Sequence, residues 1–226
     1  MRSRARYDTL VASLPHLAPP ERTDRLPINR ERLEARLRLL SAMHARELSA
    51  AVDFLEWQRR PPAATAAALQ REWADLLASL CEPALRAVVA FHRDARTVLA
   101  ALRRRGRGED PAGPPPWAAG PWADALLRHW DEPDFRLGAV FPWLAPARAH
   151  LEAGEVAELE RLLGDLEWRL LVRLAEAEPF GFPAVVAFRF QWGLLERRLA
   201  RDRARSRARF EHLMQEVCGE HSPSPD

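Results

Sequence analysis

Apolar residues recur at spacings of three and four along every long segment of the sequence, and this periodicity constrains the fold most. Between 29 and 57 the repeat consists of Leu33, Leu37, Leu40, His44, Leu48, Val52 and Leu55. An apolar face that repeats every 3.6 residues is the signature of an amphipathic helix. No segment alternates β-branched and polar residues between hairpin turns, as strands do. The sequence therefore predicts an all-α protein built as one or more helical bundles.

Prolines divide this periodic sequence into separate helices. The first follows Pro27, can be capped by Asn29, and stops at the "RRPP" of 59–62, because proline cannot continue a helix and asparagine is a preferred N-cap. The predicted helices of the N-terminal part cover 29–57, about 64–80 and about 83–103. Short proline turns between them favour an N-terminal helical bundle over 1–102.

The stretch 103–121, "RRRGRGEDPAGPPPWAAGP", is rich in glycine, proline and charge, and it predicts a flexible linker. A C-terminal helical region is expected over 122–218, followed by a disordered tail over 219–226. Its predicted helices are the short "WADALLRHW", a leucine-rich helix over 147–178 and a last helix over about 184–217. At ~1.5 Å per residue the last helix would be roughly 50 Å long, well beyond an ordinary globular helix.

The last helix combines an apolar seam with arginines on both of its sides. The seam consists of Val185, Phe188, Trp192, Leu195, Leu199, Phe210, Leu213 and Val217, with Asp202 and Ser206 in its polar middle. Arginines flank a packing seam when they are solvated or paired with acidic neighbours. We expect the polar middle to mark where the helix leaves its own core. The predicted partner-binding residues are Arg197, Arg201, Asp202, Arg205, Ser206 and Arg209.

No motif for catalysis, cofactor binding or metal binding is found in the sequence. It contains no Gly-x-Ser-x-Gly turn, no phosphate-binding loop and no lysine, so the usual nucleophile and phosphate-loop signatures are missing. His44 with Glu47 and His212 with Glu216 lie one helical turn apart, but the paired Glu-x-x-His motifs of di-iron bundles are absent. We therefore expect no enzymatic activity, no cofactor, no metal and no small-molecule substrate.

The charge balance limits the partners. The chain has 34 basic and 32 acidic residues and a formal net charge of +2, so it is not a polycation that coats nucleic acid. The run "RRLARDRARSRARF" could still contact phosphates, and the alternative interpretation is a nucleic-acid-binding helical protein that uses this helix. Glu196, Asp202 and Glu211 interrupt the arginines, which favours a protein partner.

Cysteine usage and hydropathy predict the compartment. Cys81 and Cys218 lie far apart and form no disulfide framework, which favours a reducing compartment. The apolar run after the basic N-terminus is interrupted by Pro15, and no window approaches the roughly 20 apolar residues that cross a bilayer. We expect a cytoplasmic protein that contacts a membrane only through its partners.

Two stretches at opposite ends of the chain carry a family resemblance. The first is "YDTLVASLPHLAP" with "LPINRERLEARLRLLS", and the second is "FGFPAVVAFRFQWGLLERRLARDRARSRARFEHLMQEV". Together they resemble uncharacterised bacterial proteins encoded among the genes of V/A-type (vacuolar-type) ATPases. The string "LVASLP" after an aromatic residue is the most family-like, and the resemblance is weak between the two stretches.

The resemblance implies a structural role. In such gene clusters the protein occurs where the C-type component of the central stalk would be expected, and that component is an all-helical socket that sits on the membrane rotor ring and receives the shaft. The implied function is a non-catalytic subunit or assembly factor, peripheral to the inner membrane through the ATPase complex. Its partners would be stalk and rotor-ring subunits. Their acidic residues would meet Arg197, Arg201, Arg205 and Arg209.

Overall fold

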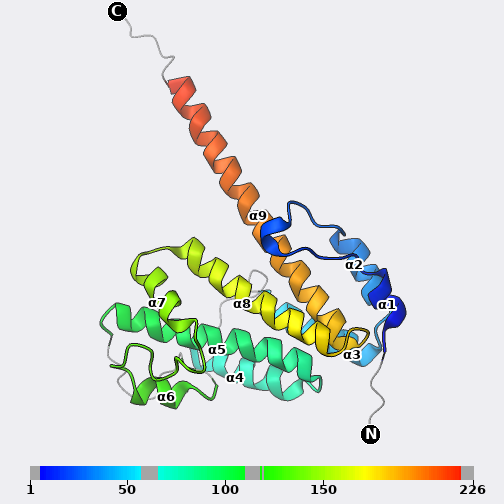
Figure 1. The fold of residues 1–226 in the computed structure, drawn as a ribbon, viewed down its shortest axis with the longest axis horizontal. Coiled ribbons are helices and arrows are strands. Elements are labelled where there is room, and N and C mark those ends of the chain that lie inside the picture. The colour runs from blue at the N-terminus through cyan, green and yellow to red at the C-terminus, as the bar shows by residue number, and fades with distance from the viewer. Residues whose placement is uncertain (1–5, 57–65, 110–117, 119, 220–226) are drawn as a thin grey trace, which may run out of the picture.

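The all-α prediction is confirmed by the structure (Figure 1). The computed structural model describes residues 6–56, 66–109, 118 and 120–219. About 72% of the chain is helical, and these ranges contain no β-strand, only an isolated antiparallel bridge between Arg6 and Gly181.

The helices follow one another along the chain, with longer connections before and after α6. In order they are α1 (Asp8–Ser13), the 3-10 turn η1 (Pro20–Arg22), α2 (Arg30–Leu37), α3 (Ala42–Leu55), α4 (Ala66–Ser79), α5 (Pro83–Gly106), α6 (Ala123–Arg128), α7 (Leu144–Glu152), α8 (Val156–Ala177) and α9 (Phe182–Gly219). The last helix matches its prediction closely, since it extends two residues beyond 184–217 at each end.

The helix predicted over 29–57 is two helices, so that prediction is wrong in its middle. Asn29 caps α2 as expected, and its side chain accepts a hydrogen bond from the backbone N–H of Arg32 at 3.0 Å. Ser41 then caps α3 by accepting from the N–H of His44 at 3.3 Å. A serine at an N-cap satisfies an amide that has no partner within the helix. Leu40, beside this break, is buried. The apolar spacing therefore continues through the break and does not reveal it.

The helix predicted over 147–178 is likewise two helices, α7 and α8. The turn between them contains Gly154, whose φ is +71°. This left-handed conformation suits glycine and disfavours residues with a Cβ atom. The apolar spacing is interrupted at this turn, because Gly154 and Glu155 stand three and four residues after Leu151. The prediction passed over that interruption.

Three apolar clusters hold the described helices together. The largest includes Leu10, Leu48, Trp73, Val88, Leu171 and Val185, and a second joins the far half of α5 to α6, α7 and α8. Helices on both sides of the predicted linker 103–121 therefore share cores. The start of that stretch continues α5 to Gly106, whereas 110–117 and 119 lie outside the described residues, as do positions 220–226 of the predicted tail.

The N-terminal segment is fastened to the start of α9. The backbone N–H of Tyr7 donates to the carbonyl of Phe180 at 2.7 Å, and Tyr7 Oη lies 2.5 Å from Nδ1 of His44. The His44 ring stacks on Phe182 with 4.0 Å between ring centres, and its Nε2 lies 3.0 Å from Glu82 Oε1. This partly buried chain of contacts fixes the near end of α9.

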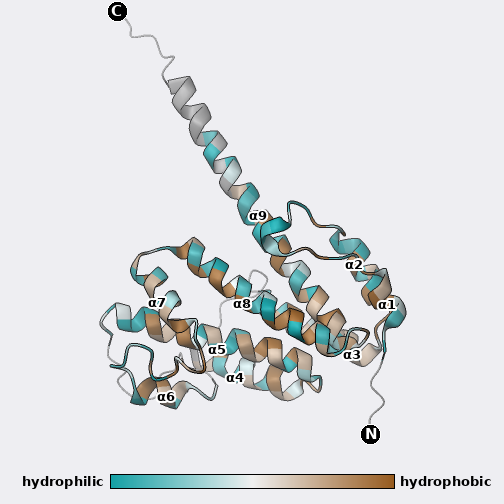
Figure 2. Cartoon of the chain, viewed as in Figure 1, coloured by the Kyte–Doolittle hydropathy of each residue, from teal (hydrophilic) through white to brown (hydrophobic). Residues whose placement is uncertain are grey.

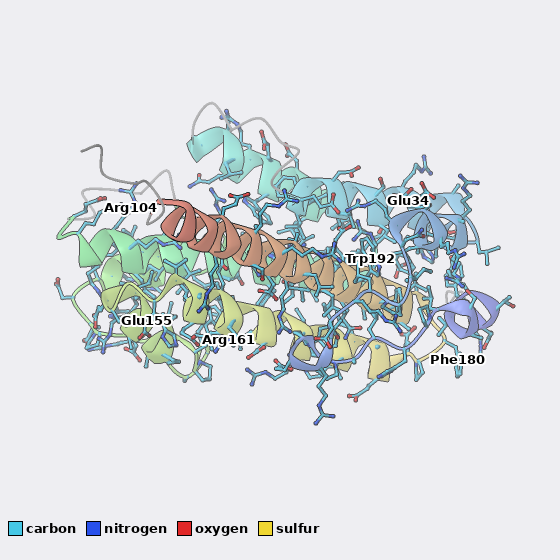
Figure 3. The ribbon with its side chains drawn as sticks, turned by 90° about the horizontal axis from the view of Figure 1, so that it is seen from above. Glu34, Arg104, Glu155, Arg161, Phe180 and Trp192 are labelled. Carbon is cyan, nitrogen blue, oxygen red and sulfur yellow. The ribbon has the colours of Figure 1, made fainter. Side chains whose placement is uncertain are left out.

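Helix α9 is packed along its first half and projects from the body along its second half (Figure 1). Figure 3 shows the packed half between α3 and α8, both of which it contacts. In Figure 2 the ribbon changes from largely hydrophobic to largely hydrophilic where the helix leaves the body. Leu199 is the last residue of α9 that the structure describes as buried.

A matched pair of glycine substitutions tests the break between α7 and α8. Gly154→Ala is expected to lower the free energy of unfolding by about 1 kcal/mol, because alanine resists the left-handed conformation. Gly164→Ala adds the same methyl group within α8, where nothing lies within 4 Å of it, and is expected to raise that free energy by about 0.5–1 kcal/mol. Urea unfolding followed by circular dichroism measures both. Shifts of equal size and sign would contradict the turn geometry.

Candidate protein interface on α9

The six predicted partner-binding residues lie where α9 leaves the body. Arg197 precedes the last described buried residue, Leu199, and Arg201 and Asp202 follow it directly. Ser206 and Arg209 are exposed farther along the projecting half, while the side chain of Arg205 lies outside the described residues. The backbone of one continuous helix places all six.

Two of these arginines already contact carboxylates of α8. Arg201 Nη1 donates to Glu160 Oε2 at 2.7 Å, and Arg197 Nη2 lies 3.9 Å from Glu167 Oε2. The Arg201–Glu160 pair is about half exposed, and such pairs contribute roughly 0–1 kcal/mol. An incoming carboxylate could therefore exchange with Glu160 at little cost. The sequence predicted that these arginines flank the apolar seam of the last helix. It did not predict that they contact carboxylates of α8.

Glu167, the carboxylate beside Arg197, is a residue of this site that the sequence did not predict. Its side chain is 5% exposed, and its Oε1 lies 3.1 Å from Nε2 of His92 on α5. Burial opposes its ionisation, but the charge and hydrogen bond of His92 and the charge of Arg197 outweigh burial and lower the pKa of Glu167. A signal for its burial is present in the sequence, because Glu167 lies on the same helix face as Leu163 and Leu171.

Next to the Arg201–Glu160 pair, α9 also lines a small cavity of about 180 Å³ against α8 and η1. Its polar lining includes Glu21, Asp165, Arg198 and Asp202. Burial, followed by the charge of Glu21, raises the pKa of Asp165. Arg198 Nε lies 3.6 Å from Asp202 Oδ2. Asp202, placed in the polar middle of the seam, thus helps to hold an arginine against the body.

The projecting half is strongly basic near the body. From 201 to 211 it carries five arginines and two carboxylates, Asp202 and Glu211, which gives a formal charge of +3. The described side chains in this span, including Arg203, Arg207 and Arg209, are exposed. An exposed helix with this charge can attract an acidic surface over about 8–10 Å at moderate salt.

Two negative findings limit the chemistry of the described part of the chain. Within it, no group of three or more histidine, cysteine, aspartate or glutamate residues is arranged to hold a metal ion. Nor does any helix there combine the length and the apolar character that a membrane span needs.

Comparisons with known proteins identify no relative. No protein-family model, no curated protein and no solved structure matches the chain.

The buried Glu167 gives a pH dependence that can be measured. Because its folded-state pKa lies below the ordinary value of 4.5, ionised Glu167 stabilises the fold above about pH 4.5, and this contribution is lost as the pH falls through the folded-state value. Glu167→Gln is expected to lower the free energy of unfolding by about 1–3 kcal/mol at pH 7. The difference from the unsubstituted chain should shrink below about pH 4.5.

Urea unfolding at several pH values between 3 and 7 makes this comparison. The control, Glu160→Gln, removes a half-exposed partner of Arg201 and should cost no more than about 1 kcal/mol. A difference for Glu167→Gln that stays constant across this range would contradict the ionised, paired state of Glu167.

Proposed function

We propose that the chain is a non-catalytic subunit or assembly factor of a bacterial V/A-type ATPase. In this role it acts as a helical socket, like the C-type component of the central stalk, and links the central shaft to the membrane rotor. It contacts stalk and rotor-ring subunits, and it meets the membrane only through them, on the cytoplasmic side. The starting point is the resemblance carried by the two ends of the sequence.

The observation that carries the proposal is that these two ends pack together. Tyr7 pairs with Phe180 through the backbone, and the indole N–H of Trp192 on α9 donates to the carbonyl of Ile28 at 2.8 Å. Arg30 on α2 pairs with Glu196 on α9 at 2.5 Å. The two family-like stretches, far apart in sequence, thus form one packed unit. A shared packed unit is what a common structural role of the two stretches requires.

The shape of α9 suits a part that transmits force between subunits. Its first half is anchored by Val185, Trp192 and Leu195, which are at most 1% exposed. Its second half continues as the same helix beyond the body. A rigid helix with one buried end and one free, charged end can seat a partner and pass load to the core. Such a role needs a broad interface and no catalytic group.

The contacts of the arginines favour a protein partner over nucleic acid. Arg197, Arg198 and Arg201 each lie within 4 Å of a carboxylate of this chain, so arginine–carboxylate pairing already characterises this surface. A carboxylate beside a guanidinium group opposes the approach of a phosphate, because both are anions. Binding to nucleic acid is the alternative function, and it would show itself by affinity that falls steeply with salt.

Charge reversal on the projecting helix tests the proposal. The tagged chain, expressed with the subunits of a V/A-type ATPase from the same genome, is expected to co-purify with stalk and rotor-ring subunits. Arg205→Glu combined with Arg209→Glu should lower their recovery by about tenfold or more, because like charges then face each other across the interface. Quantitative mass spectrometry of the eluate measures the recovery.

The control reverses two exposed arginines with the same spacing on α8, Arg169→Glu with Arg173→Glu, and should leave recovery unchanged. Both double variants should retain the helical circular dichroism spectrum. If the unsubstituted chain recovers no ATPase subunit and instead binds oligonucleotides with a steep salt dependence, the alternative function replaces the proposed one.

A further inference from the structure

A second surface, which shares Arg197 and Arg201 with the candidate interface but lies mainly on α5 and α8, has the composition of a helix-binding groove. It lies between α5, α8 and α9 and has a volume of about 460 Å³. Its floor includes Leu99, Leu163 and Leu194, and its arginines are Arg96, Arg103, Arg197 and Arg201. Groove residues on α5 recur at spacings of three and four from Phe91 to Arg103, so they share one helix face about three turns long.

The groove is open where α8 lacks a side chain. Gly164 lies in the middle of α8 and lines this groove. A Cβ atom added there would meet nothing within 4 Å. Glycine in a helix interior is destabilising relative to alanine, and at Gly164 no close packing requires it. The missing side chain leaves room between the arginines of α5 and those of α9.

The groove is positively charged. Four arginines and two glutamates, Glu160 and Glu167, give a formal charge of +2 when His92 is neutral. Both glutamates already have partners, since Glu160 accepts from Arg201 and the buried Glu167 pairs with His92. Arg103 is exposed on the α5 side. The groove therefore favours a ligand with negative charge along its edges.

The apolar floor decides the kind of ligand. A small polyanion would use the arginines and leave the half-buried Leu163 and Leu194 of the apolar lining facing water. An amphipathic helix with acidic residues beside its apolar face satisfies both, because helices dock by placing their apolar face in such grooves and carboxylates pair well with guanidinium groups. We propose that this groove binds an acidic amphipathic helix of a partner protein. The inference holds whether or not that partner belongs to a rotary ATPase.

Site-specific photo-crosslinking in the native host tests the occupant. The full chain carries p-benzoylphenylalanine in place of Ala100, which lines the groove, or in place of Arg86, which is exposed on α5 outside it. Position 100, but not position 86, is expected to crosslink to one segment of another protein. Mass spectrometry of the crosslinked peptide should show apolar residues at spacings of three and four, flanked by aspartate or glutamate.

Two further substitutions separate the steric and electrostatic contributions. Gly164→Leu fills the opening in the floor, and Arg103→Glu reverses one edge. Each should lower the crosslink yield from position 100 by about tenfold or more, while Arg86→Glu should not change it. Gly164→Leu is expected to leave the thermal unfolding midpoint unchanged or raise it, because leucine has the higher helix propensity.

Several results would overturn the inference. They are equal crosslinking from positions 100 and 86, crosslinks to a basic segment, to nucleic acid or to a second copy of this chain, and a yield that neither Gly164→Leu nor Arg103→Glu changes. The outcomes separate this inference from the proposed function. An acidic helix from a protein outside the ATPase would support the groove, and the motor assignment would then rest on the co-purification experiment alone. Co-purification with ATPase subunits without a crosslink from position 100 would support the motor assignment and contradict the groove.

Discussion

Burial of the first half of α9 is the interaction on which the rest of the structure depends. Val185, Trp192 and Leu195 are almost completely removed from water, and apolar burial contributes about 25 cal/mol per Å². Because α9 lies between α3 and α8, this single helix joins the N-terminal helices to α8. The same burial fixes the direction in which the second half projects, so the core determines where a partner can be met.

Buried polar contacts then restrict this packing to one arrangement. Tyr7, His44 and Glu82 link the N-terminal segment to the starts of α3 and α5, and His92 with Glu167 links α5 to α8. A buried polar group is costly unless it is paired, so alternative helix registers that break these pairs are disfavoured. The second pair also holds Arg197 at the edge of the groove. The buried polar pair thus helps to position a charged residue, Arg197, on the surface.

Helical periodicity predicted the fold class and the extent of α9, because both follow from the spacing of apolar residues within one segment. It could not predict the break at Ser41, since the apolar spacing runs through it. The break at Gly154 was passed over, although the spacing is interrupted between Leu151 and Leu159. It identified Arg197 and Arg201 as edge residues. It could not supply Glu167 and Glu160 as their partners, because those contacts depend on how α8 is set against α9. For the same reason the groove, which needs three helices, is not visible in any single segment.

Helix α9 is one continuous helix whose first half belongs to the core, and we propose that its second half binds a partner. Hydrogen–deuterium exchange of the isolated chain and of the chain in its complex tests this directly. The account predicts that amides over 184–199 exchange about 100-fold or more slowly than amides over 203–211 in the isolated chain, and that the second span becomes protected in the complex. Equal protection of both spans in the isolated chain, or no gain of protection over 203–211 in the complex, would contradict it.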